Sequence, residues 1–223
     1  MSVPSAVAGL LRRPARLGDE VYSAIFERIM TLDIAPGGRI SVDAMARELG
    51  VSPTPVREAL ARLEAEGLVH KTHLVGYSAS AQLSSKQFAD LYQLRLLLEP
   101  FVARQCAALM ADAMIDELAG LCEDMRNLAA AETLNGYANF AQLDMVFHDQ
   151  LAAGAGNELV IAALGRLHTH VHLFRLVATP KATNAAVDEH LAIVAALRQR
   201  DPNAAEAAMR DHVVQSRVRF GRD

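Results

Sequence analysis

Four side chains in the second half of the chain have the residue types and spacing of a metal site. Asp144 and His148 are four residues apart, so in a helix they lie one above the other on the same face. His190 and His212 each stand among apolar residues of later segments, which points both imidazoles inward. One carboxylate and three imidazoles suit zinc, nickel, iron or copper and leave positions open for water or an anion. From spacing alone, histidines that are hydrogen-bonded within the core remain the alternative.

Other polar residues could hold a small anion beside this cluster. Arg95 offers a guanidinium that can bind a carboxylate through two parallel hydrogen bonds. An ion pair with Glu99, one helical turn later, is the alternative for this arginine. Three further residues are candidates to contact such an anion: Asn157, His172 and Arg175. A solvated or core-edge position is the alternative for His172.

The region from Ser84 onward, which must position these groups, has the pattern of long amphipathic helices. We expect helices over residues 84–109, 113–131, 134–153, 159–177, 187–200 and 202–220. Pro100 implies a kink or a break in the first of them. Asp201 and Pro202 have the types preferred at the start of the last one. Since strands and helices do not alternate, a parallel sheet is not expected.

Residues 43–69, nearer the front, predict a helix-turn-helix. The first helix ends at Gly50, and Ser52 is expected to cap the second with its hydroxyl. The second helix carries apolar residues at helical spacing: Val56, Leu60 and Leu63. Thr54, Arg57 and Arg62 lie off this face, which leaves hydroxyl and guanidinium groups for phosphates and base edges. Ser52 joins them as a candidate DNA contact.

The segments on either side of this motif complete a DNA-binding unit. We expect a helix over residues 19–32 before it and a two-stranded wing over residues 68–80 after it. Lys71, His73 and the loop near Gly76 would face the minor groove or phosphates, although plain surface histidine is an equal alternative for His73. Residues 1–17 are expected to form a flexible arm.

Composition agrees with a globular protein of the cytoplasm. Hydrophobic residues make up 52% of the 223 residues, which is enough for a sizeable core. Two cysteines are too few for a disulfide framework, and no apolar run is long enough to span a membrane. The net charge of -4 arises after residue 80: residues 1–80 hold nine basic and nine acidic residues, and residues 81–223 hold 13 and 17. Overall charge therefore does not decide for or against DNA.

Two sets of motifs resemble one known family. The words VSPTPVREAL (residues 51–60) and RLEAEGLV (residues 62–69) resemble the winged helix-turn-helix of GntR-family bacterial transcription regulators. Pro53 departs from that pattern, because the family commonly has a DNA-contacting arginine there. The wording DxxFH, GN, EHxxIxxAL and AxxAMxxH, over residues 144–212, resembles the FCD ligand-binding domain of the FadR-like subfamily.

The resemblance implies a fold, a site and a function. The fold is mainly α: a winged helix-turn-helix (18–80) after the arm (1–17), then an antiparallel all-helical bundle (84–223). Asp144, His148, His190 and His212 would hold a divalent metal, with zinc expected and nickel, iron or manganese possible. A small carboxylate would bind beside it, and Arg95 matches an arginine commonly found near that cavity.

The expected function is a homodimeric transcription regulator, acting as a repressor, whose affinity for operator DNA is controlled by a small organic acid. A metal-dependent hydrolase is the alternative, since such a metal site could activate water. The sequence offers no separate nucleophile–base pair for it, so an enzyme is not expected. A purely structural metal is the third possibility.

Overall fold

The computed structural model describes residues 12–130, 133–167, 169–175 and 183–221. The chain divides into two compact units, Met1–Gln82 and Leu83–Asp223, and each is described by itself. Within the described ranges, none of the helices has the length and apolar character that crossing a membrane requires.

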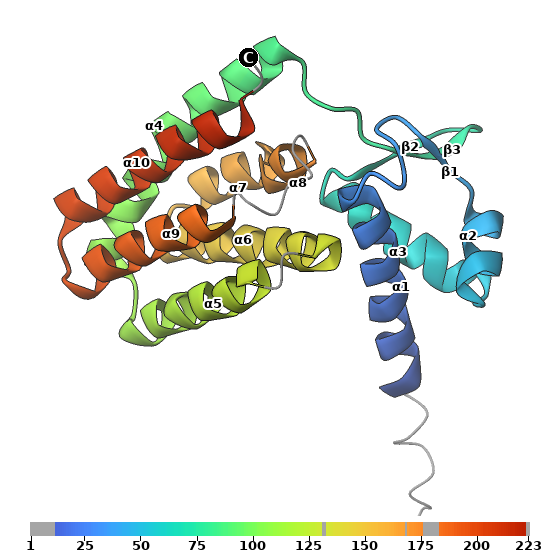
Figure 1. Cartoon of the computed structure of the whole chain (residues 1–223), viewed down its shortest axis with the longest axis horizontal. Helices are drawn as coiled ribbons and strands as arrows, with labels where there is room; N and C mark the ends of the chain where they lie inside the picture. The colour runs from blue at the N-terminus through green and yellow to red at the C-terminus, as the bar shows by residue number, and fades with distance from the viewer. Residues whose placement is uncertain (1–11, 131–132, 168, 176–182, 222–223) are drawn as a thin grey trace, which may run out of the picture. The chain divides into compact units, whose positions relative to one another are not determined.

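The first unit consists of helices and a small sheet (Figure 1). Its elements, in order, are α1 (Arg12–Met30), β1 (Arg39–Ile40), α2 (Val42–Leu49), α3 (Pro53–Ala65), β2 (Val69–Thr72) and β3 (Gly76–Ala79). The prediction of an arm up to residue 17 is wrong from Arg12 onward, because α1 already begins there. The rest of that arm lies outside the described residues.

Helices α2 and α3 form the predicted helix-turn-helix. The Ser41 hydroxyl caps α2 by accepting the Ala44 N–H, and Gly50 ends it with a left-handed φ of 67°. Ser52 stands at the N-cap of α3, but its hydroxyl makes no capping hydrogen bond, contrary to the prediction. The reason is that Pro55 occupies the third helical position, so the N–H that a capping hydroxyl often accepts is missing.

The wing contains one more strand than the sequence indicated. The antiparallel sheet has the order β1-β3-β2, with Val69 opposite Ala79 and Arg39 opposite Ser78. Strand β1 has only two residues, too few for alternation to be visible in the sequence. The apolar sides of α1 and α3 pack on each other to form the core of this unit.

The second unit is helical throughout its described residues. Its helices are α4 (Ser85–Leu109), α5 (Asp112–Ala130), α6 (Leu134–Gly154), α7 (Glu158–Leu167), α8 (Thr169–Phe174), α9 (Thr183–Arg198) and α10 (Pro202–Phe220). Helix α4 continues through Pro100, so a break there is not found. The helix expected over residues 159–177 corresponds to α7 and α8, which lie on either side of residue 168, and its expected end at residues 176–177 lies outside the described residues.

Helix packing brings four distant segments together. Helix α10 lies along α4 and α9, α5 packs on α6 and α9, and α4 also contacts α6 (Figure 1). The start of α10 is fixed as predicted, since Asp201 accepts the backbone N–H groups of Asn203 and Ala204, and Pro202 stands at the first position. The shared interior of α4, α6, α9 and α10 contains many charged and polar side chains.

Candidate metal centre and nucleic-acid interface

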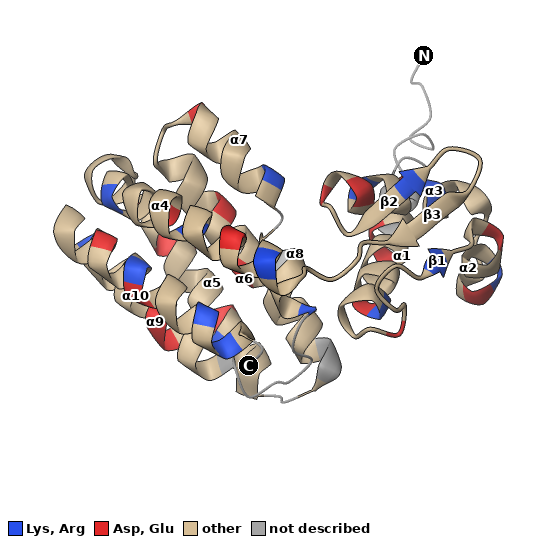
Figure 2. Ribbon diagram, turned by 90° about the horizontal axis from the view of Figure 1, so that it is seen from above, with Lys and Arg blue, Asp and Glu red and all other residues tan. Residues whose placement is uncertain are grey.

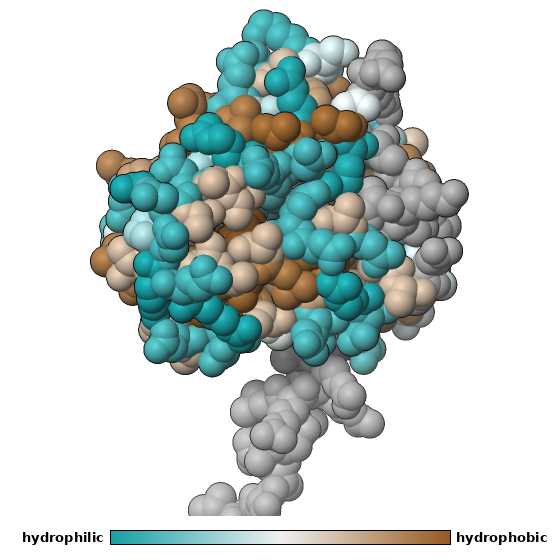
Figure 3. All heavy atoms as spheres, turned by 60° about the vertical axis from the view of Figure 1, so that its left-hand side comes forward, coloured by the Kyte–Doolittle hydropathy of each residue, from teal (hydrophilic) through white to brown (hydrophobic). Residues whose placement is uncertain are grey.

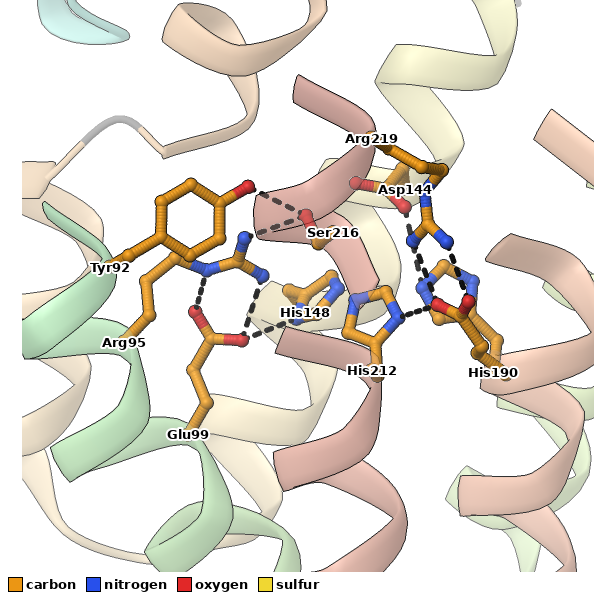
Figure 4. A network of polar contacts seen from close by, with 10 residues as sticks. Tyr92, Arg95, Glu99, Asp144, His148, His190, His212, Ser216 and Arg219 are labelled. Atoms are coloured by element: carbon orange, nitrogen blue, oxygen red, sulfur yellow. Dashed lines mark hydrogen bonds and ion pairs between the residues drawn. The ribbon is translucent and has the colours of Figure 1, made fainter. Parts of the chain in front are cut away.

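The interior of the second unit holds a cluster of buried polar groups that a purely structural core would avoid. Each is at most 8% exposed: Arg95, Glu99, Asp144, His148, His190, His212 and Ser216. They come from α4, α6, α9 and α10 and point toward one another (Figure 4). Burial of charged and polar groups is costly unless they are paired or bind an ion. This concentration of buried polar groups is therefore the candidate functional site of the unit.

Three imidazoles converge in this cluster. His148, His190 and His212 each offer a ring nitrogen, and these nitrogens all lie within 4.8 Å of one another. Asp144 Oδ1 lies 3.4 Å from His190 Nε2. Two ligand atoms about 2.1 Å from one tetrahedral zinc ion would lie roughly 3.4 Å apart. The donor set and its spacing therefore fit a divalent metal bound by the three histidines, with Asp144 beside them.

The ring of His190 has a further support that the sequence did not reveal. Phe147, which is fully buried on α6, stacks on it with ring centroids 4.3 Å apart and an interplanar angle of 25°. Glu99, which was expected only as a possible partner of Arg95, also stands beside the cluster. Three further groups there were not among the predicted site residues: Glu189, Ser216 and Arg219. The sequence gave little sign of these contacts, since Glu189 of α9 and its partner Arg219 of α10 are 30 positions apart.

Arg95 forms the ion pair that was the alternative to ligand binding. Its Nε donates to Glu99 Oε1 at 2.7 Å, and its Nη2 donates to Glu99 Oε2 at 3.1 Å. Its Nη1 donates to the Ser216 hydroxyl, which also contacts the Tyr92 hydroxyl. Burial alone would lower the pKa of Arg95, but the Glu99 carboxylate raises it above its ordinary value. The fork of Arg95 is therefore already engaged within the protein.

A small cavity lies beside the imidazole cluster. Its lining residues are Arg95, Phe140, Asp144, Leu173, Phe174, Ala186, His212, Ser216, Arg219 and Phe220. The free space is about 10 Å³, close to that of one water molecule, so any larger ligand must displace side chains. Its charged lining residues are Arg95, Asp144 and Arg219, and three phenyl rings supply apolar surface.

The other expected ligand contacts do not line this cavity. Asn157 is exposed, and its Oδ1 accepts the N–H groups of Leu159 and Val160 at the start of α7. His172, on α8, is half-buried. Arg175 is 1% exposed, and burial lowers the pKa of its guanidinium. Of the candidate residues predicted from the sequence, three line the described cavity: Arg95, Asp144 and His212.

His212 should make the stability of the metal-free protein depend on pH. Burial, followed by the charges of His190 and His148, lowers the pKa of His212 well below its usual value. The unfolded chain therefore binds a proton below about pH 6.5 that the folded chain does not bind until lower pH. Stability should fall with decreasing pH in that window, by up to about 1.4 kcal/mol per pH unit. Urea unfolding in chelator should show a smaller slope for His212→Asn, whereas His73→Asn in the exposed wing should leave it unchanged.

Helix α3 presents a polar face suited to DNA. Val56, Leu60 and Leu63 are buried, while Thr54 and Arg57 are exposed on the other side of the helix. Within the part of the chain that the structure describes, no hydrogen bond or ion pair engages Arg57, and its guanidinium can reach outward. Basic and acidic residues are interspersed over the unit (Figure 2). Recognition would thus depend on the local placement of cations and not on a large basic field.

Arg62 is placed differently from the expectation that it faces DNA. Its Nη1 donates to Asp19 at 2.8 Å, and its guanidinium lies 4.1 Å from the centroid of the Tyr22 ring. Both partners belong to α1, so Arg62 tethers the second helix of the motif to the first helix of the unit. Its spacing on α3 identified an exposed position but could not identify this partner.

The wing carries the other candidate contacts. Lys71 is exposed on β2, with its ammonium 5.6 Å from the Tyr77 ring centroid, and His73 is exposed in the following turn. Gly76 begins β3 with a φ of 105°, a conformation that favours glycine. The sequence did not single out Leu74 and Val75, which are 93% and 57% exposed at the tip. An apolar wing tip can pack on sugar and base edges in a groove.

The fold and the buried site define a two-part DNA-binding regulator, and comparison with known families names its class. Residues 17–77 match the family described as "Bacterial regulatory proteins, gntR family", and residues 90–215 match the FCD domain. The chain belongs to the GntR family of transcription regulators, in its FadR-like subfamily with an FCD domain. Its relatives are transcription regulators and not enzymes.

Individual relatives and structures agree with this class. The transcriptional repressor NanR of Klebsiella aerogenes is 30% identical over 92% of this chain and 86% of its own. An uncharacterised regulator of Agrobacterium vitis is 34% identical over 60% of this chain and 78% of its own. Escherichia coli McbR/YncC shares the fold with a TM-score of 0.68 at 17% identity, covering 92% of this chain and 96% of the other.

Proposed function

We propose that this regulator is a homodimeric repressor whose operator affinity is set by a small organic acid bound beside a divalent metal. The observation that carries the proposal is the convergence of His148, His190 and His212, with Asp144 beside them, in a chain that also has a DNA-binding unit. The repressor role is supported by relatives that bear that description.

The metal would be held by the three imidazoles and Asp144, and zinc fits this donor set. When bound, it would supply a positive centre that takes one oxygen of an acid. The residues of the chain itself hold the imidazoles in place and keep the surroundings dry. Because Arg95 is paired with Glu99, the main attraction for a ligand carboxylate comes from the metal centre.

The walls of the cavity indicate what kind of acid would bind. Phe140, Leu173, Phe174 and Phe220 supply apolar surface close to His212. A compact acid with an apolar body would bury that body against these side chains, whereas a polyhydroxylated acid would lose hydrogen bonds to water. We therefore favour short branched or aromatic carboxylates as the effector.

Exposed apolar side chains on α4 and α10 support a dimer. These two helices pack side by side, and their outer surfaces carry Leu94, Leu97, Phe101, Val214 and Val218, each between 39% and 72% exposed. Figure 3 shows hydrophobic side chains gathered between polar ones on one face of the molecule. A second copy of the chain is the partner that would pair two recognition helices with the halves of a palindromic operator.

Arg57→Ala should weaken operator binding by about 1–3 kcal/mol per recognition helix if Arg57 reads a base. The side chain is exposed on α3, so its loss should leave the fold unchanged. Fluorescence anisotropy with operator and with unrelated DNA at several salt concentrations measures the effect. A loss that is equal on both DNAs would instead assign Arg57 to a phosphate, with a salt slope smaller by about one.

The matched control is Arg126→Ala, because Arg126 is an exposed arginine of the second unit, where it lies on α5 and pairs with Asp188 of α9. It should not change DNA binding. If Arg57→Ala bound the operator as tightly as the unsubstituted protein does, α3 would not be the recognition helix, and the proposed mode of DNA binding would be wrong.

A further inference from the structure

Two of the clustered imidazoles are each held by a carboxylate that is itself held by an arginine. On one side, Glu189 Oε2 lies 2.9 Å from His212 Nδ1. Arg219 donates two hydrogen bonds to the same carboxylate, from Nη1 to Oε1 at 2.5 Å and from Nη2 to Oε2 at 2.7 Å. Figure 4 shows this chain of contacts running from Arg219 to the imidazole.

A similar arrangement stands on the other side of the cluster. Glu99 Oε2 lies 3.4 Å from His148 Nδ1, and Arg95 holds both oxygens of Glu99. In both sets of contacts an arginine binds a glutamate that in turn faces a histidine, but the two sets join different pairs of helices. Glu99 and Arg95 are on α4, whereas Glu189 is on α9 and Arg219 is on α10.

These contacts decide which nitrogen of each ring is available to a metal. A carboxylate can only accept, so the facing Nδ1 must carry the hydrogen. The lone pair is then on Nε2, at the other end of the ring. An imidazole whose remote N–H is fixed by a carboxylate has its tautomer and its ring direction set before a metal arrives. The arginine keeps the carboxylate ionised and fixes its plane.

We propose that Glu189, backed by Arg219, is a positioning residue for the metal-binding imidazole of His212, and that Glu99, backed by Arg95, has the same part for His148. The inference rests on the proposed metal function and adds residues that do not themselves bind the metal. The 2.9 Å contact of Glu189 makes it the stronger of the two. Arg219 acts only through Glu189.

The test is a titration of chelator-stripped protein with Zn²⁺ against a chromophoric competitor. Glu189→Gln should lower Zn²⁺ affinity roughly 10–100-fold, as is typical for the loss of such an outer partner. Arg219→Met should lower it less, and the double variant should lose no more than Glu189→Gln alone, because the arginine acts through the carboxylate. Glu206→Gln, which changes a carboxylate of α10 that pairs at the surface with Arg104, is the matched control and should have no effect.

A second measurement separates positioning from mere support of the fold. The visible absorption of Co²⁺ bound at the site reports ligand geometry, and it should change in Glu189→Gln but not in Glu206→Gln. Melting of the metal-free proteins gives the structural contribution independently. A lower melting temperature combined with unchanged Zn²⁺ affinity and an unchanged Co²⁺ spectrum would overturn the inference.

The outcomes for the two proposals are distinct. If the unsubstituted protein bound no Zn²⁺ or Co²⁺, the proposed metal function would be wrong, and this inference with it. If it bound metal and Glu189→Gln bound it equally well, the metal function would stand and the positioning role would be rejected. Losses in Glu189→Gln and Arg219→Met that simply add in the double variant would show that the arginine does not act through Glu189.

Discussion

Replacing Glu99 by glutamine is expected to lower the free energy of unfolding of the metal-free protein by about 3–5 kcal/mol. The change leaves the guanidinium of Arg95, which is 1% exposed, without its counter-charge inside the bundle. Burial alone would raise the pKa of Glu99, but Arg95 holds it well below its usual range, so the carboxylate is ionised in the folded protein. Chemical denaturation in the presence of chelator measures the loss.

The same helix provides the control. Lys86 and Asp90 on α4 also form a pair four residues apart, at 2.6 Å, but their side chains are 83% and 51% exposed. Asp90→Asn should cost no more than about 0.5 kcal/mol, because an exposed pair gains little from its charges. Replacing both buried partners, as Arg95→Met with Glu99→Leu, should recover most of the stability. If Glu99→Gln cost as little as Asp90→Asn, the buried pair would not be charged as described.

His190→Gln is expected to lower Zn²⁺ affinity by more than the roughly 100-fold that marks the loss of an outer partner. His190 is fully buried, stacks on Phe147 and is one of the three clustered imidazoles. Glutamine keeps much of the side-chain volume but offers a poor ligand. Stabilisation by metal, about 2.7 kcal/mol at a concentration 100 times the dissociation constant, should largely vanish with it. Unfolding with and without Zn²⁺ measures this difference.

His70→Gln removes an exposed imidazole of β2 and is the control, because that side chain is remote in sequence from the cluster and belongs to the other unit. Equal stabilisation of His190→Gln and unsubstituted protein by Zn²⁺ would place the metal elsewhere. If Zn²⁺ stabilised the unsubstituted protein while no apolar acid altered its operator affinity, the metal would be structural and the effector proposal wrong. Coupling must also be reciprocal: operator DNA should change acid affinity by the same factor.

Periodicity and end signals predicted most of the helices because they are local. Gly50 ends α2 in the left-handed conformation, and Asp201 with Pro202 begins α10, as their residue types indicated. Where a boundary depends on tertiary packing, the sequence was less informative. Helix α4 continues through Pro100 in a buried interior, and the two-residue β1 exists only because β3 lies beside it.

The same distinction between local and tertiary signals holds for the residues of the candidate site. His190 and His212 could be predicted because each lies in register with apolar residues on its own helix, and His148 because it follows Asp144 by one helical turn. Their partners could not be found, since Glu189 meets His212 and Arg219 only when α9 and α10 pack together. Likewise, Arg62 is exposed on α3 by its spacing, but its pairing with Asp19 depends on the docking of α1.

The two prolines at the start of α3 have a consequence for how operator preference could be redesigned. The first turn of a helix usually has free backbone N–H groups, which can bind a DNA phosphate independently of the base sequence. Here Pro53 and Pro55 leave Thr54 with the sole amide hydrogen among the first three helical positions. Affinity of this helix for the operator must then come largely from its side chains. Substitutions at a few of its surface positions should therefore change the preferred operator more readily than in a regulator whose backbone amides bind the phosphates.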